Sequence, residues 1–239
     1  PIQGEGGVRQ LSDAFVEALC ELTQKHGTLL VADEVQTAIG RSGHFLFSKQ
    51  WPREPDVVLI AKALGGGLMP ISATLAKMDT FNQAYGKHFE AAESHNSTFS
   101  YNALSCVAAM ATLDLLTDEL IEHVRVQGAE FRQDLHDALH DNPLFEEVRG
   151  SGHMCGIKLR QPENPWLSFQ QFGFSELKDR ATIGPLLARR LYRRGFFTFA
   201  CGHDWSILRL QPRMNIERSK LNAFVTACRE ELAHLAELD

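Results

Sequence analysis

The sequence predicts an α/β fold, in which a sheet carries helices on both faces, followed by a smaller α+β unit. Short, wholly apolar runs alternate with stretches in which apolar residues recur at helical spacing. Acidic or glycine-rich segments end these runs abruptly, as at the end of a strand. The chain has 239 residues, 44% hydrophobic and 23% charged, which is a globular composition that excludes disordered and collagen-like chains.

The first helix is predicted between Leu11 and Gly27. Apolar residues recur there at helical spacing as far as Leu22, and Ser12 or Asp13 is suited to cap the amino end. Gly27 follows the last turn, where glycine commonly ends a helix.

Three apolar runs then predict strands of the first sheet: residues 28–32, 57–60 and 71–76. The first is a continuous apolar run that ends at Asp33, which is typical of a strand buried on both faces. The second ends at Lys62, and three consecutive glycines at 65–67 force a turn before the third.

The second half reads as a small α+β unit. Helical spacing covers residues 103–116 and continues through a long, charged stretch to Leu139. Short strands are predicted at 145–148, 155–159, 196–199 and 207–210, with helices around 186–192 and 221–235. Residues 161–180 have no clear period and predict a long connection. We therefore expect two domains, residues 1–117 and 118–239.

The composition also excludes several classes of function. The formal net charge of −6 argues against a nucleic-acid partner, and no apolar run reaches the roughly 20 residues that a membrane helix needs. The five cysteines form no CxxC pair, and the ten histidines include no HExxH, so no metal site is expected. A reduced, cytoplasmic chain is the expectation.

Asp33, Gln36 and Lys62 are the first candidates for chemistry. In open α/β sheets the ligand lies beyond the carboxyl ends of the strands, so these three side chains are expected at one site. A lysine that closes an apolar strand is costly to desolvate unless it is paired or covalently used. The alternative is that Lys62 extends to the surface and Asp33 caps the next helix.

A nucleotide-hydrolysing enzyme is a competing interpretation. The apolar strand followed by Asp33-Glu34 also matches the segment that holds magnesium in those proteins. They need a phosphate-binding loop of the form GxxxxGK[ST], and none occurs in these residues. The single Gly-Lys pair, Gly86-Lys87, has Phe81 in place of the first glycine and His88 in place of the hydroxyl residue.

Six ordered motifs resemble the class III aminotransferases, which are pyridoxal-phosphate enzymes of fold type I. The motifs are PIQGEGG at 1–7, ADEVQTAIGRSG at 32–43, AKALGGGLMPI at 61–71, HNSTF at 95–99, VRGSGHMCGIKL at 148–159 and ILRLQPRMNI at 207–216. The resemblance covers nearly the whole chain. It implies the C-terminal half, or slightly more, of a full-length member, so residues 1–117 would be the C-terminal part of the large domain.

The resemblance implies a role for each matching cofactor residue. Lys62 would form the Schiff base with the cofactor aldehyde and then shuttle a proton. Asp33 would keep the pyridine nitrogen protonated, which makes the ring an electron sink. Gln36 would bond the 3-hydroxyl group of the ring, and Val35 would pack on its face. Thr98 matches a residue that reaches the cofactor phosphate of the neighbouring subunit, which implies a homodimer with shared active sites.

Glu5 and Arg209 match a pair that gates the substrate site in some members of this family. The planar guanidinium suits an α-carboxylate, and the glutamate neutralises it when an amine without that carboxylate binds. A purely structural ion pair is the alternative. Arg213 adds a second cation close by in the sequence, which suits an anionic or carrier-bound substrate.

Two segments depart from the family pattern close to the expected entrance of the active site. Ala38 stands where glycine is usual after Gln-Thr, and Ser100-Tyr101-Asn102 replaces Gly-Gly-Asn. We therefore expect a substrate pocket unlike that of the commonest members, while the cofactor stays the same.

The function implied is transfer of an amino group between an amine or amino acid, often at a terminal amine, and a 2-oxo acid or aldehyde. Two alternatives stay open. One is a decarboxylase or aminomutase that uses the same cofactor and lysine. The other is an incomplete, non-catalytic module, since the sequence begins at Pro1 and residues that would complete the cofactor pocket are expected upstream.

Overall fold

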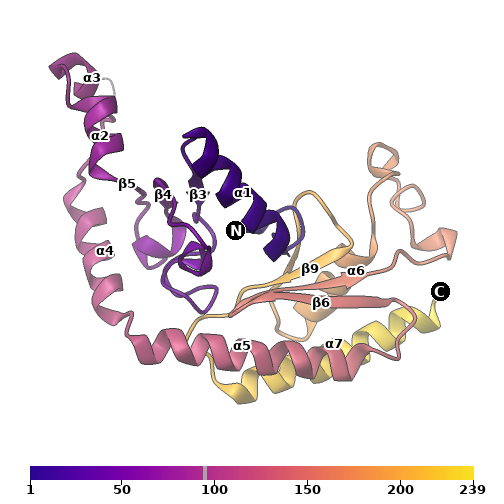
Figure 1. The fold of residues 1–239 in the computed structure, drawn as a ribbon. Helices are drawn as coiled ribbons and strands as arrows, with labels where there is room; N and C mark the ends of the chain where they lie inside the picture. Colours follow the sequence, from indigo (N-terminus) through magenta and orange to yellow (C-terminus); the bar gives the residue numbers. More distant parts are fainter. Residues whose placement is uncertain (94–95) are drawn as a thin grey trace. The chain divides into compact units, whose positions relative to one another are not determined.

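The structure, a computed structural model, describes residues 1–93 and 96–239 (Figure 1). It divides into two compact units. The first consists of Pro1 and residues 11–121, and the second of residues 2–10 and 122–239. Both units mix helices with a sheet. The predicted domains, residues 1–117 and 118–239, stay a prediction, and the structure adds that residues 2–10 pack with the second unit.

The sheet of the first unit contains all three predicted strands. They are β3 (Val31–Asp33), β4 (Val57–Ile60) and β5 (Ala73–Ala76), with β4 in the centre. β3 runs parallel to β4, and Asp33 is paired with Leu59. β5 is antiparallel to β4. The parallel pair brings the carboxyl ends of β3 and β4 to the same edge of the sheet.

Helix α1 (Asp13–His26) has the ends that its sequence predicts. The Ser12 hydroxyl caps it by accepting a hydrogen bond from the backbone N–H of Phe15. Gly27 ends it in the left-handed conformation, with φ of 63°, which glycine adopts without a steric penalty. Val16 and Cys20 of α1 pack against Leu30, which fixes the helix beside β3.

The expectation that the first strand is buried on both faces is wrong. Leu30 and Ala32 are buried, but Leu29 and Val31 are 55% and 52% exposed. Successive side chains of a strand point to opposite faces, so one face of this sheet packs on the core and the other is left open by the described residues. Asp33 lies on the same face as Val31.

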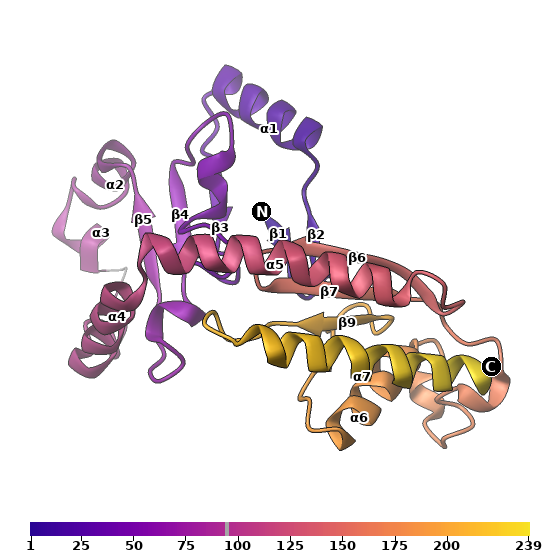
Figure 2. The same cartoon turned by 90° about the horizontal axis from the view of Figure 1, so that it is seen from below.

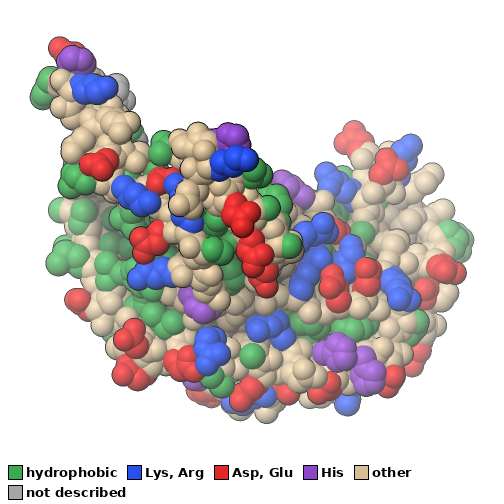
Figure 3. All heavy atoms as spheres, viewed as in Figure 1, with side chains coloured by type: hydrophobic (Ala, Val, Ile, Leu, Met, Phe, Trp, Pro, Cys, Tyr) green, Lys and Arg blue, Asp and Glu red, His purple; other side chains and the backbone are tan. Residues whose placement is uncertain are grey.

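Helices α2 (Met78–Tyr85), α3 (Phe89–Glu93) and α4 (Ala103–Leu115) complete the first unit, together with the short 3-10 helices η1 (Phe47–Gln50) and η2 (Lys62–Gly65). Hydrophobic side chains gather on the surface over α4 (Figure 3). Leu104, Val107 and Met110 are each more than 60% exposed.

The second unit is built on a four-stranded antiparallel sheet in the order β6-β7-β9-β8. Its strands are β6 (Phe145–Ser151), β7 (Met154–Leu159), β8 (Phe199–Ala200) and β9 (Ile207–Leu210). Its helices are α5 (Asp118–Leu139), which begins in the first unit, α6 (Ile183–Arg193) and α7 (Arg218–Glu237). A hairpin of β1 (Ile2–Gln3) and β2 (Arg9–Gln10) joins this unit, and the 161–180 connection contains only the 3-10 turns η3 (Pro165–Leu167) and η4 (Ser175–Leu177).

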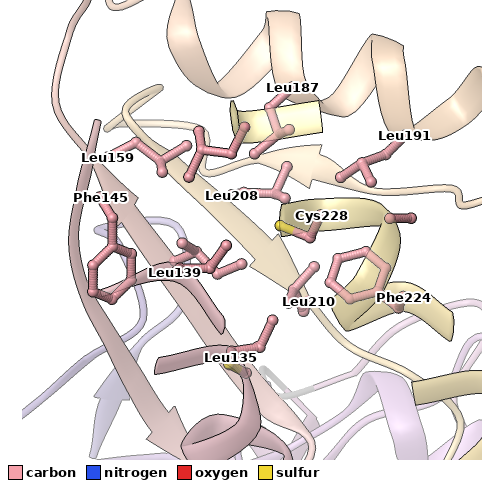
Figure 4. Packing of buried hydrophobic residues seen from close by; sticks show 14 of the residues in the cluster. Leu135, Leu139, Phe145, Leu159, Leu187, Leu191, Leu208, Leu210, Phe224 and Cys228 are labelled. Carbon is pink, nitrogen blue, oxygen red and sulfur yellow. The ribbon is translucent and has the colours of Figure 1, made fainter. Parts of the chain in front are cut away.

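The helices of the second unit share one hydrophobic core with the sheet (Figure 4). Leu187 of α6, Leu208 of β9 and Cys228 of α7 are fully buried within it. α5 and α7 run alongside each other (Figure 2), and the rings of Phe131 and Phe224 meet there with centroids 6.0 Å apart. Burial raises the pKa of the Cys228 thiol to about 12, so it stays protonated and unreactive.

Strand alternation then decides which side chains of β9 face away from this core. Leu208 and Leu210 belong to the core, so Arg209 points to the opposite face of the sheet. Residues 2–10 lie on that face, where a Cβ atom added at Gly156 would lie 3.1 Å from the Val8 side chain. The sequence therefore brings Arg209 to the side of the sheet that carries Glu5.

Candidate active site

The carboxyl ends of β3 and β4 bring Asp33 and Lys62 to one edge of the first sheet. Asp33 is the last residue of β3, and Lys62 begins η2 two residues after the end of β4. Both side chains are exposed. This is the arrangement that the apolar runs of the sequence predict, and it follows from the parallel pairing of the two strands.

Lys62 has a strained backbone. Its φ is +46°, in the left-handed region that residues other than glycine rarely adopt. No described residue forms a hydrogen bond or ion pair with its ammonium group. Lys62 thus extends to the surface of the described chain, but strained backbone of this kind clusters at active sites and ligand clamps, which supports a functional role for this residue.

Glycine makes the turn after Lys62 possible. Gly66 has φ of 63°, and a Cβ atom there would lie 2.6 Å from the Oγ1 of Thr112 in α4. A larger residue would be strained in this backbone conformation, and the Thr112 hydroxyl would have to shift. The glycine run therefore lets α4 support the backbone that carries Lys62.

Asp33 has one oxygen bonded and one free. Its Oδ1 accepts a hydrogen bond from the backbone N–H of Val35 at 3.0 Å. Among the described residues nothing bonds its Oδ2. The chain after Glu34 forms turns rather than a helix, so the alternative in which Asp33 caps a helix is wrong. The carboxylate closes a local turn and keeps one oxygen for another partner.

Gln36 and Val35 follow Asp33 in the same turn, and both are half-buried. The Oε1 of Gln36 is buried and has no hydrogen-bond partner among the described residues. An acceptor without a partner costs free energy unless a ligand supplies the donor. This atom is therefore evidence for a bound group with a hydroxyl or another donor.

Glu34 is a site residue that the sequence reasoning passed over as half of an acidic pair. It is fully buried, and it accepts hydrogen bonds from the Thr37 hydroxyl and, at 2.6 Å, from the backbone N–H of Ser48. The carboxylate thus ties the turn that carries Val35 and Gln36 to η1. Glu34 differs from Asp33 only in being buried. The sequence alone does not show which of these two adjacent acidic residues is the buried one.

Asp56 anchors the sheet from its opposite end. The carboxylate accepts from the Leu30 N–H at 2.8 Å, from Arg53 at 2.6 Å and from Lys77 at 3.0 Å. Burial by itself would raise the pKa of this carboxyl group. The backbone N–H of Leu30 and the two cations outweigh burial, so its pKa lies below the ordinary value.

Thr98 lies in the turn before α4. The turn is closed by Ser97 and Ser100, whose backbone groups are 2.9 Å apart, and Asn102 caps α4 by accepting from the Ser105 N–H. The Thr98 side chain is exposed, and the structure shows no contact between it and Asp33 or Lys62. His95, the first residue of the HNSTF motif, lies outside the described residues.

Glu5 and Arg209 form an ion pair in the second unit, in which Arg209 Nη1 donates to Glu5 Oε1. Their side chains are 41% and 20% exposed. The other carboxylate oxygen of Glu5 accepts from the backbone N–H of Gly202 at 2.9 Å. The structure thus brings this predicted pair into contact across 204 positions of sequence.

The open groups at the ends of β3 and β4 fit pyridoxal phosphate. The protonated ring nitrogen of this cofactor needs a carboxylate, its 3-hydroxyl group needs a hydrogen-bond acceptor, and its aldehyde needs an amine. Asp33, Gln36 and Lys62 offer these groups in that order, and each keeps an atom that no described residue bonds. Within the described ranges no cluster of three or more histidine, cysteine or acidic side chains is arranged to hold a metal ion. Within the same ranges no helix has the length and apolar character to cross a membrane.

Comparisons with known proteins agree on one family. The family model described as aminotransferase class-III matches residues 1–232. The chain is 32% identical over 237 residues to a putrescine aminotransferase of Pectobacterium atrosepticum, with 98% of the chain and 46% of that protein covered. It is 38% identical over 171 residues to an ornithine aminotransferase of Staphylococcus aureus, with 70% of the chain and 40% of that protein covered.

Solved structures support the fold. An ornithine aminotransferase of Toxoplasma gondii, described with partial occupancy of PLP at its active site, superimposes with a TM-score of 0.80 at 26% identity. The match covers 99% of this chain and 50% of that one. The α/β class and the fold type I scaffold are therefore confirmed. The chain spans about half the length of the relatives it matches.

Proposed function

The chain belongs to the class III aminotransferases, and on that basis we propose that it is part of a pyridoxal-phosphate-dependent aminotransferase. The reaction is transfer of an amino group between an amine or amino acid and a 2-oxo acid or aldehyde. The observation that carries the proposal is a set of groups at one sheet edge that no described residue bonds: the Oε1 of Gln36, the Oδ2 of Asp33 and the ammonium group of Lys62.

When bound, the cofactor supplies an electron sink for the negative charge that develops on the substrate carbon. Lys62 Nζ would hold the cofactor and then take and return the substrate proton. The Asp33 carboxylate would hold a proton on the ring nitrogen, Gln36 Oε1 would accept from the 3-hydroxyl group, and Val35 would pack on the ring.

The donor substrate is proposed to carry a terminal primary amine. Putrescine and ornithine, the compounds named in the relatives, both have such an amine, and ornithine also has an α-carboxylate. Arg209 would bind an α-carboxylate through its planar fork, and Glu5 would neutralise Arg209 when that carboxylate is absent. The ion pair between Glu5 and Arg209 supports this gate.

The working assembly is proposed to be a cytoplasmic homodimer with shared active sites. Thr98 would bond the cofactor phosphate of the partner subunit. The surface around Thr98 supports this arrangement because Phe99 and Tyr101 are 81% and 94% exposed, and an aromatic pair at this exposure suits a protein interface.

Two measurements on the holoenzyme test the reaction. The first is visible absorbance, since a protein that holds the cofactor through a lysine is yellow and a non-catalytic module is colourless. The second is product analysis by mass. A new amino acid formed from the 2-oxo acid supports transfer. Carbon dioxide indicates a decarboxylase, and an isomer of the substrate indicates an aminomutase.

A mixed dimer tests the shared site. Thr98→Ala should weaken cofactor binding by about 1–2 kcal/mol, the size of one hydrogen bond to a charged group. Pairing a Lys62→Ala subunit with a Thr98→Ala subunit places both lesions in one site, so half of the sites should bind cofactor normally. Two impaired sites in the hybrid would mean that Thr98 acts within its own subunit.

A further inference from the structure

We propose that the backbone N–H of Gly202 positions the Glu5 carboxylate against Arg209 and so helps to set which substrates this protein accepts. The inference rests on the proposed gate role of Glu5 and Arg209. It assigns a specificity-determining position to the loop between β8 and β9, residues 201–206, which no motif in the sequence singles out.

The two oxygens of the Glu5 carboxylate have different partners. Oε1 accepts from Arg209, and Oε2 accepts from the Gly202 N–H at 2.9 Å. A backbone donor at one oxygen still restrains the carboxylate when the ion pair at the other oxygen breaks, because a hydrogen bond to a charged acceptor is a strong one. Gly202 therefore gives Glu5 a fixed point that does not depend on Arg209.

The loop also holds the backbone around Glu5. The His203 N–H donates to the Glu5 carbonyl oxygen at 3.1 Å, and the Cys201 thiol donates to the Gly4 carbonyl oxygen at 3.4 Å. Three consecutive loop residues thus contact two consecutive residues near the start of the chain. The position of the Glu5 side chain therefore depends on the position of this loop.

Bonds that do not involve Glu5 fix the loop itself. Lys158 donates to Asp204 at 3.0 Å and to the Ser206 hydroxyl at 2.5 Å. The indole N–H of Trp205 donates to the Gly202 carbonyl oxygen at 3.2 Å. Because these bonds join the loop to β7 and to itself, the Gly202 N–H is already oriented before Glu5 binds it.

The Glu5 carboxylate can lie this close to the backbone at position 202 only because that residue is glycine. A Cβ atom there would lie 2.8 Å from the Oε2 of Glu5. That oxygen is the end of a flexible, partly exposed side chain, so an alanine would displace the carboxylate and leave the fold intact. Gly202→Ala is therefore a selective change to the position of Glu5.

The consequence for specificity has a definite direction. Displacing Glu5 weakens its pairing with Arg209, so the guanidinium becomes more available to an α-carboxylate and is no longer neutralised for an amine that lacks one. Gly202→Ala should favour substrates with an α-carboxylate over simple terminal amines.

Amide hydrogen exchange tests the positioning by itself, without any reaction. In Glu5→Ala, the Gly202 amide should exchange about tenfold faster, as expected for loss of one hydrogen bond to a charged acceptor. The control is His203→Ala, which removes an exposed side chain and keeps every backbone donor. Equal Gly202 exchange in the parent and in Glu5→Ala would overturn the proposal.

Kinetics of the holoenzyme test the specificity. The ratio of kcat/KM for a diamine to kcat/KM for an α-amino acid should fall about tenfold in Gly202→Ala and stay constant in His203→Ala. An unchanged ratio in Gly202→Ala, with activity retained, would overturn the specificity role while the proposed aminotransferase function stands. An inactive parent would contradict that function instead, and the exchange result would still decide the positioning.

Discussion

The residues at the ends of β3 and β4 differ from Glu5 and Arg209 in how far the chain itself satisfies them. Asp33, Gln36 and Lys62 keep polar atoms that no described residue bonds, whereas the carboxylate of Glu5 has a partner at each oxygen. A buried polar atom without a partner, such as Gln36 Oε1, costs free energy and persists where a ligand offsets that cost, whereas the exposed atoms of Asp33 and Lys62 are accessible to a ligand. These differences fit the proposed roles, in which the first group holds a bound molecule and the second group exchanges one partner for another.

Lys62→Ala is expected to have the largest effect. It should abolish turnover and the covalent hold on the cofactor, because no other described side chain at this edge supplies an amine. The midpoint of thermal unfolding should stay unchanged, since Lys62 has no bonded partner to lose and its substitution leaves the core intact. Cofactor that can still be fixed by borohydride in this variant would contradict the role of Lys62.

Asp33→Asn should cost about 10²–10³ in the rate of the chemical step, as losing a preorganised charge that stabilises the transition state typically does. The variant should retain the cofactor and the turn at Val35, because an amide oxygen still accepts from that N–H. Single-turnover kinetics measure the effect. A rate equal to that of the parent would show that the carboxylate has no such role.

Asp56 is a useful contrast to Asp33, because its carboxylate is fully paired and lies away from the candidate site. Its pKa is lowered in the folded state, so its contribution to stability is present above the unfolded pKa and is lost as the pH falls through the folded pKa. Asp56→Asn should cost about 1–3 kcal/mol at neutral pH and flatten the acid dependence of unfolding. Urea denaturation between acid and neutral pH measures both, with the exposed Asp13→Asn as control.

Glu5→Gln is expected to have a small effect on stability, below about 1 kcal/mol, because the pair with Arg209 is partly exposed. Its effect should appear in substrate preference, with KM lowered for a 2-oxo acid and raised for a diamine. A loss of stability comparable to that of Asp56→Asn would make the pair structural and would contradict the gate.

Several helix ends and strands could be predicted because the residues within and beside each element specify it. The caps of α1 at Ser12 and Gly27 and the strand at 207–210 lie where the sequence places them. Asp33 and Lys62 were also predictable as neighbours, since two parallel strands end at the same edge. The strand predicted at 196–199 is observed as a shorter strand at Phe199–Ala200, because only these two residues pair with β9.

The first ten residues are a segment whose structure local sequence patterns do not predict. Residues 2–10 look like a polar loop in sequence, but they form a hairpin that packs with the second unit. No periodicity in so short a segment distinguishes a loop from a strand pair, and its partners are more than 100 positions away. The resemblance to a family, rather than any spacing, pointed to Glu5 and Arg209.

The sequence by itself determined the α/β class, the helix ends, the edge that carries Asp33 and Lys62, and the family. Only the tertiary structure decided that Glu34 is buried while Asp33 is exposed, that Val31 faces outward, and that Gly202 holds Glu5. The first set depends on neighbouring residues and on strand direction, which a sequence records. The second depends on which distant segments cover or bond a side chain, and that is fixed only when the chain has folded.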